Sequence, residues 1–155
     1  MRLIFRSEGV VALLMSLLIV GCGANQKQES HTHDDAETSV RIPETYTAAI
    51  EKCGFHLAEI GELIEKGELS KVHKEAAKIR DIARKLPQLA KDNIPVEELK
   101  DINIKSKELA GMFTLVDKAA DSGDKEGTLH AYEVMQSLVE ALKLHSNHDD
   151  EHEDH

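Results

Sequence analysis

The sequence has no tryptophan, and its aromatic residues together make up only 3% of the 155 positions. Surfaces that bind sugars or stack on flat ligands depend on aromatic rings, so this shortage argues against those functions. The sequence also lacks a nucleophile elbow, a phosphate-binding loop and a paired-carboxylate motif, and we therefore expect no enzyme. What is present is an aliphatic composition that suits a helical domain.

Long apolar runs are scarce as well. The longest extends from Val10 to Val20 and follows a basic start at Arg2 and Arg6. It is too short to span a membrane comfortably as a permanent helix, so we interpret residues 1–21 as a signal peptide. The remaining 134 residues suit one folded domain.

The end of this run, Ile19-Val20-Gly21-Cys22, resembles the lipobox of bacterial lipoproteins. The resemblance implies cleavage just before Cys22 and attachment of acyl chains, palmitate among them, to that cysteine. Several chains would anchor the protein stably to a membrane of the cell envelope, facing the periplasm. Gly23 stands where an aspartate would indicate inner-membrane retention, which slightly favours the outer membrane. An ordinary signal peptide with an incidental cysteine is the alternative.

Cysteine is rare too, because Cys53 is the only one besides Cys22. No disulfide framework within the chain is therefore available. The formal net charge is −10, and it becomes −11 once Arg2, Arg6 and Glu8 leave with the signal peptide. This charge argues against nucleic acid as a partner and favours cations.

Two polar segments flank the expected domain. Residues 22–40 are rich in Gln, Ser, Thr, Asp and Glu. They hold too little apolar surface to offset the loss of chain entropy on folding, so we interpret them as a lipidated flexible tether. Residues 146–155 are equally polar, and we expect a frayed or disordered C-terminal tail.

Between these segments, residues 41–145 carry apolar side chains at helical rather than strand spacing. Four such stripes predict an all-α fold, an antiparallel up-down-up-down four-helix bundle. We expect Pro43 and Gly67 to begin and end the first helix, Pro87 to kink the second, Pro95 to open the third and Asp124 to cap the fourth. The stripes are Tyr46, Ile50, Cys53, Leu57, Ile60 and Ile64; Leu69, Val72, Ala76, Ile79, Ala83 and Leu86; Leu99, Ile102, Ser106, Leu109, Phe113, Val116 and Ala120; and Thr128, Ala131, Met135, Leu138 and Leu142.

Two short segments match each other, Glu65-Lys66-Gly67-Glu68 and Asp121-Ser122-Gly123-Asp124. Each is expected to form the turn of one helical hairpin. In architecture the fold over residues 42–145 resembles the cytochrome c′ and cytochrome b562 type of bundle. A c-type haem needs Cys-x-x-Cys-His, and Cys53-Gly54-Phe55-His56 lacks the second cysteine. The first helix has no methionine for a b562-like haem, so we expect no haem.

Two groups of residues within the expected bundle are candidates for internal metal sites. Cys53 and His56 lie three residues apart on one helix, and Met112 and Met135 fall at a similar height, a ligand set that suits copper. The alternative is ordinary core packing, with His56 at the edge of the stripe. The second candidate pairs His73 with His130, which each follow one of the matching turns, and its alternative is two solvated histidines.

The strongest chemical signal is a set of histidines interleaved with acidic residues at both ends of the processed chain. Imidazole and carboxylate are ligands for Zn, Cu and Ni ions. If the last helix extended through the C-terminal histidines, their spacing would place them on one stripe, so metal binding could be coupled to helix extension. These histidines are His31 and His33 near the N-terminal side, and His145, His148, His152 and His155 at the C-terminal side.

Histidine-rich tails of this kind resemble those of small periplasmic proteins that accompany heavy-metal efflux or uptake. The function implied is binding of divalent transition-metal ions, as a buffer, a sensor or an accessory to metal transport beside an efflux or other envelope complex. One alternative is a non-catalytic helical module that docks on an envelope complex through Ile94, Ile104 and Leu144, with the tails as solubilising spacers. Another is a pH-responsive protein, because nine histidines titrate near neutrality.

Overall fold

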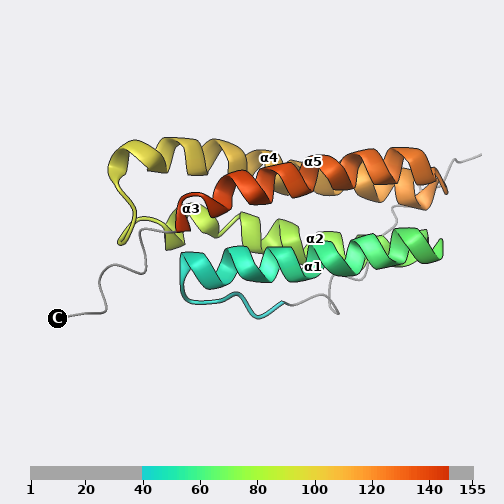
Figure 1. Ribbon diagram of the computed structural model, residues 1–155, viewed down its shortest axis with the longest axis horizontal. Helices are drawn as coiled ribbons and strands as arrows, with labels where there is room; N and C mark the ends of the chain where they lie inside the picture. The colour runs from blue at the N-terminus through green and yellow to red at the C-terminus, as the bar shows by residue number, and fades with distance from the viewer. Residues whose placement is uncertain (1–39, 147–155) are drawn as a thin grey trace, which may run out of the picture. The chain divides into compact units, whose positions relative to one another are not determined.

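The computed structural model describes residues 40–146, and these form an all-helical body with no strand among them (Figure 1). The predicted all-α class is confirmed. A 3-10 turn, η2 (Leu69–Lys71), precedes the second long helix, and a short helix, α3 (Leu86–Leu89), follows it. The four long helices are α1 (Tyr46–Lys66), α2 (Val72–Ala83), α4 (Val96–Asp121) and α5 (Lys125–Lys143).

Each long helix packs against two others. Helix α1 contacts α2 and α5, while α4 contacts the same two helices from the other side, and α3 rests mainly on α4. Figure 1 shows the four long helices lying side by side. Among residues 40–146, no helix is long and apolar enough to cross a bilayer.

The predicted stripes make up most of the core, but several positions differ from expectation. Leu69, Leu99 and Phe113 are only partly buried, whereas Ala49 and Ile82 are buried outside the stripes. Ile94, expected on an exposed patch, is only 5% exposed because the segment between α3 and α4 turns it onto the core. Val139 is buried, whereas Leu138 is only partly buried against the same cluster. Ile104 and Leu144 are exposed, as predicted.

The helix boundaries also refine the sequence prediction. Thr45, not Pro43, caps α1, because its side chain accepts a hydrogen bond from the Ala48 amide. Pro87 does more than kink the second helix. Helix α2 ends at Ala83, and α3 begins at Leu86 with the proline in its first turn, where the missing amide hydrogen costs no helical bond.

The two matching turns have the same geometry. Gly67 and Gly123 both adopt a φ of 73°, the left-handed conformation that glycine adopts without a Cβ penalty. In each turn the glycine amide and the amide that follows it donate back to carbonyl groups of the last helical turn. The chain thus reverses after α1 and after α4 by the same device.

Several predicted features lie outside the described residues. These include the signal peptide, Cys22, nearly all of the tether and most of the tail. At the two boundaries the folded body is slightly longer than predicted, because Val40 packs against the core and Ser146 is buried.

Alanine substitutions should separate the turn glycines from a helical one. Gly67→Ala or Gly123→Ala should lower the free energy of unfolding by about 1–2 kcal/mol, since alanine is strained at positive φ. Gly54→Ala, in the interior of α1 where a Cβ meets no atom within 4 Å, should raise it by about 0.5–1 kcal/mol. Urea unfolding followed by circular dichroism measures all three. Equal effects at Gly54 and Gly67 would contradict the turn geometry.

Candidate functional site

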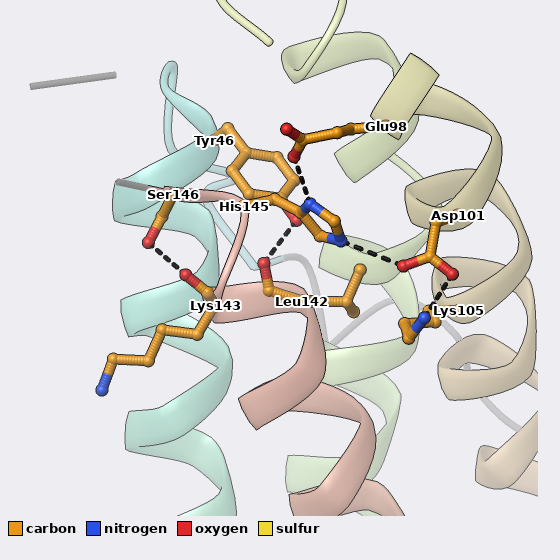
Figure 2. A network of polar contacts seen from close by, with 8 residues as sticks. All are labelled: Tyr46, Glu98, Asp101, Lys105, Leu142, Lys143, His145 and Ser146. Carbon is orange, nitrogen blue, oxygen red and sulfur yellow. Dashed lines mark hydrogen bonds and ion pairs between the residues drawn. The ribbon is translucent and has the colours of Figure 1, made fainter. Parts of the chain in front are cut away.

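His145 follows the end of α5 and lies between two carboxylates of α4 (Figure 2). Its Nδ1 is 2.5 Å from Oε2 of Glu98, and its Nε2 is 3.0 Å from Oδ2 of Asp101. Both partners are acceptors, so both ring nitrogens can donate only when the ring is a protonated imidazolium. A ring that carries both protons would donate to both carboxylates at once.

The local sequence explains why these groups meet. Glu98 and Asp101 are three residues apart on the first turns of α4, and Lys105 follows four residues later on the same face. His145 and Asp101 each lie 22 residues from Gly123 along the chain, so the reversal there brings them to the same level. Carboxylates at the start of α4 and an imidazolium past the end of α5 also complement the dipoles of both helices.

Lys105 completes the group, and we refer to Glu98, Asp101, Lys105 and His145 as the His145 cluster. The ammonium of Lys105 donates to Oδ1 of Asp101. Hydrogen bonds from Lys105 and then His145 hold the pKa of Asp101 below its ordinary value of 3.8, outweighing the effect of desolvation. Asp101 is thus a carboxylate at neutral pH, with the ammonium of Lys105 at one oxygen and the ring of His145 at the other.

Residues at the start of α1 fix the end of α5 from another side. The hydroxyl of Tyr46 donates to the carbonyl oxygen of Leu142 at 2.8 Å, and Thr47 donates to that of Ser146 at 3.3 Å. Burial raises the pKa of the fully buried Tyr46, which keeps its hydroxyl a donor. Ser146 donates in turn to the carbonyl oxygen of Lys143 at 2.7 Å. The last described residues are therefore docked on the body.

The His145 cluster alone does not have the ligand arrangement of a metal site. Within residues 40–146, no group of three or more His, Cys, Asp and Glu side chains is arranged to hold a metal ion. His145 is the predicted metal ligand that the structure describes, and it has a carboxylate beside each ring nitrogen. The other predicted ligands lie outside the described residues: His31, His33, His148, His152 and His155.

The internal candidate site has a different character from a copper centre. Cys53 is a fully buried free thiol, and burial raises its pKa to about 12, so it stays protonated and is neither a good ligand nor a nucleophile. Met135 is buried in the core, and the partly buried Met112 packs against the same core cluster. The arrangement of Cys53 and Met135 is that of ordinary core packing.

His56 is buried rather than at the edge of the stripe, with an exposed fraction of 3%. Its Nδ1 donates to Oε2 of Glu75 at 2.8 Å, while Lys78 donates to the other oxygen of the same carboxylate. Its Nε2 is buried with no hydrogen-bond partner among the described residues. Burial lowers the pKa of His56 below 6.5, and the hydrogen bond to Glu75 opposes that shift without cancelling it. His56 is therefore a neutral core residue near pH 7.

The pair formed by His73 and His130 is not assembled. Nδ1 of His73 donates to the carbonyl oxygen of Ser70 in its own turn at 2.9 Å, and His130 is exposed on α5. Neither makes a described contact with the other. Both have the surroundings of surface histidines.

Sequence reasoning missed the partners of His145. The sequence patterns connect neither Glu98 nor Asp101 to His145, and they place Tyr46 only on a core stripe. The signal that could have found Asp101 was its distance from Gly123, which equals that of His145. No comparable signal points to Tyr46, because its hydroxyl bonds to a main-chain carbonyl that any residue would present.

The lowered pKa of His56 makes stability depend on pH in a defined direction. As pH falls from about 7 through 6.5, the unfolded chain binds a proton that the folded chain still resists, so the free energy of unfolding should fall. His56→Gln should lose part of this decline, and His130→Gln, at an exposed position, should keep it. Urea unfolding at pH 8 and pH 5 gives the comparison. An identical pH-dependent loss in wild type and His56→Gln would be evidence against this assignment.

Comparison with protein-family models, with curated proteins and with solved structures returned no match to this chain.

Proposed function

We propose that this protein is a lipid-anchored protein of the bacterial cell envelope that binds divalent transition-metal ions. The metal ligands are His145 and the histidines of the C-terminal tail, with His31 and His33 as a second, smaller group. Cys22 carries the anchor, as its resemblance to a lipobox residue implies, and the body faces the periplasm. The role is buffering, sensing or handing on metal ions beside an efflux or other envelope complex, without catalysis.

The observation that carries this proposal is the position of His145 between Glu98 and Asp101. Histidines that bind metals commonly donate their other ring nitrogen to a carboxylate, which fixes the ring and makes the ligating nitrogen more basic. Glu98 stands in that position at Nδ1, and its side chain is only 25% exposed. The ring of His145 is thus oriented in advance for ligation through Nε2.

Asp101 supplies the second ligand. Its carboxylate lies 3.0 Å from Nε2, where a metal ion that replaced the shared proton would contact both groups. Two ligands are too few for tight binding of Zn²⁺, which usually takes four. His148 follows Ser146 by two residues in the sequence, and we propose that it completes the set together with His152 and His155.

The proposal also predicts linkage to protons. The imidazolium of His145 must lose one proton before Nε2 can ligate, so metal binding should release a proton and weaken as pH falls. The hydrogen bond from Nδ1 to Glu98 would persist in the metal-bound form. Metal binding would therefore replace one proton with a divalent cation, so the net charge of the site would rise by one.

We further propose that the four long helices form an antiparallel up-down-up-down bundle. The two glycine turns and the packing of each long helix on two others support this arrangement. In such a bundle the start of α1, the start of α4 and the end of α5 meet at one end. The proposed metal site would then lie at this end of the bundle, next to Ser146, the last described residue.

Removing the tail should abolish tight metal binding without unfolding the body, because His31 and His33 alone supply too few ligands for it. The comparison uses the chain from residue 22 with Cys22→Ser, ended either at His155 or after Ser146. Ser146 is kept because it is buried and bonded to Thr47. Calorimetry with Zn²⁺, Cu²⁺, Ni²⁺ and Co²⁺ should show micromolar or tighter binding to the longer form only.

A matched control separates ligation from charge. The triple variant His148→Asn, His152→Asn and His155→Asn keeps the length and the acidic residues of the tail, and it should bind at least tenfold more weakly than wild type. Undiminished affinity in this variant would refute the role of the histidines. No heat from any of the four ions would refute the proposed function altogether.

Glu98 and its neighbour Glu97 offer a second matched pair. Glu98→Gln should weaken Zn²⁺ binding by about 10-fold to 100-fold, because the ring of His145 loses the carboxylate that orients it. Glu97→Gln changes the same charge one residue away on an exposed position and should stay within about twofold of wild type. Calorimetry in buffers of different ionisation enthalpy would also count the proton released. Equal effects of the two substitutions would reduce the role of Glu98 to net charge.

The runner-up function is a helical module that docks on an envelope complex. Ile104 and Leu144 are exposed, at 47% and 72%, and support it, whereas Ile94 is buried and does not. This alternative predicts no metal binding at all. The calorimetric comparison above therefore decides between the two.

A further inference from the structure

A groove of about 640 Å³ lies between α2 and α4 and shares no residue with the His145 cluster. We call it the basic groove, because Arg80, Arg84 and Lys107 line it and no acidic residue does. Its apolar lining includes Pro87, Ala110 and Phe113. A volume of this size is typical of sites for small organic molecules.

The charge of the groove is opposite to that of the chain, whose formal net charge is −10. Asp81 compensates part of it, since its Oδ1 accepts from Nε of Arg80 at 2.8 Å and lies 3.8 Å from Arg84. Lys107 forms no ion pair among the described residues. At physiological salt, charges more than about 8 Å away are largely screened at the surface, so the local excess of positive charge decides what the groove attracts.

Arg80 is held in a fixed orientation. Its guanidinium lies over the ring of Phe113, 4.5 Å from the ring centroid, while Asp81 accepts from its Nε. A guanidinium positioned in this way presents its remaining N–H groups without further loss of side-chain freedom. The groove therefore has a cationic group that is oriented before any ligand arrives.

Ser106 supplies an independent indication of a ligand. It lines the groove, is only 2% exposed, and its Oγ is buried with no hydrogen-bond partner among the described residues. Buried hydroxyl groups almost always have a partner, because an unpaired one costs desolvation energy. A serine on the core stripe of α4, where an alanine would pack without that cost, has a use if a bound molecule accepts its hydrogen bond.

We propose that the basic groove binds a small organic anion, a phosphate ester or a carboxylate with an apolar body. The apolar body rests on Phe113, Pro87 and Ala110. The anionic group lies among Arg80, Arg84 and Lys107, and the hydroxyl of Ser106 donates to it. This site is separate from the proposed metal site and does not rest on it.

The test uses the full chain with EDTA present, so that no metal contributes. The probes are 2-naphthyl phosphate and 2-naphthoate, with neutral 2-naphthol and inorganic phosphate as partial ligands. Calorimetry should give a Kd below about 1 mM for at least one naphthyl anion, which molecules of this size reach at ordinary ligand efficiency. Naphthol and inorganic phosphate should each bind at least tenfold more weakly. The tighter of the two naphthyl anions identifies the preferred anionic group.

Substitutions then locate the site. Arg84→Gln and Lys107→Gln should each weaken binding about threefold to tenfold, because each removes one positive charge from the groove. Both side chains are exposed, so their loss leaves the core intact. Ser106→Ala should weaken binding without lowering the melting temperature. Lys118→Gln, on the same helix but outside the groove, is the control and should bind as wild type does.

Amide chemical shifts provide a readout that does not depend on affinity. Addition of the tighter naphthyl anion should move the amide signals of Asn103, Ser106 and Gly111, all of which line the groove. Absence of binding by both anions, binding of naphthol as tight as theirs, or shifts confined to other helices would each overturn the proposal.

Discussion

The constraint on which the rest of this structure depends is the burial of one aliphatic stripe on each of four helices. Aromatic side chains are too few to fill a core, so closely packed Ile, Leu, Val and Ala must do so. Each long helix therefore contacts two others, and the left-handed glycines at 67 and 123 allow the chain to reverse within two or three residues. Charged side chains, among them those of the His145 cluster, therefore lie near the helix ends and on the outer faces of the helices.

The His145 cluster is a direct consequence of this packing. Once α4 and α5 lie side by side from the turn at Gly123, the first turns of α4 must face the last residues of α5. Carboxylates there stabilise the start of α4 through its dipole, and they also attract a cation past the end of α5. The arrangement that docks His145 would offer a metal ion two ligands, and the proposed function needs the tail histidines to supply the others.

Sequence patterns predicted the fold well and the site only in part. Hydrophobic spacing located the stripes, and the left-handed turns followed from Gly67 and Gly123, because both signals depend on local chemistry. The fate of Ile94 could not be predicted, since its burial depends on how the segment after α3 folds back on the core. The sequence neighbours of His145 predict it as a metal ligand, a prediction that stays open, whereas its contacts with Glu98 and Asp101 depend on the pairing of α4 and α5.

Pro87 and His56 show why rules based on neighbouring residues in the sequence do not predict every position. The proline lacks an amide hydrogen, and whether the helix kinks or ends depends on what the surrounding helices can pack against. The apolar spacing predicts His56 at the border of a stripe. In the structure His56 is buried and bonded to Glu75 on the neighbouring helix. In both cases the observed structure depends on contacts between helices, and the spacing of apolar residues along one helix does not reveal these contacts.

In the proposed site His145 binds a metal ion through Nε2 while Nδ1 stays bonded to Glu98. Nitrogen-15 NMR of the imidazole rings during a Zn²⁺ titration tests it most directly, because each ring nitrogen reports its own protonation and ligation. The account predicts that the Nε2 signal of His145 moves to a metal-bound value while Nδ1 retains its proton. If both ring nitrogens of His145 remain protonated at saturating Zn²⁺, the claim is wrong.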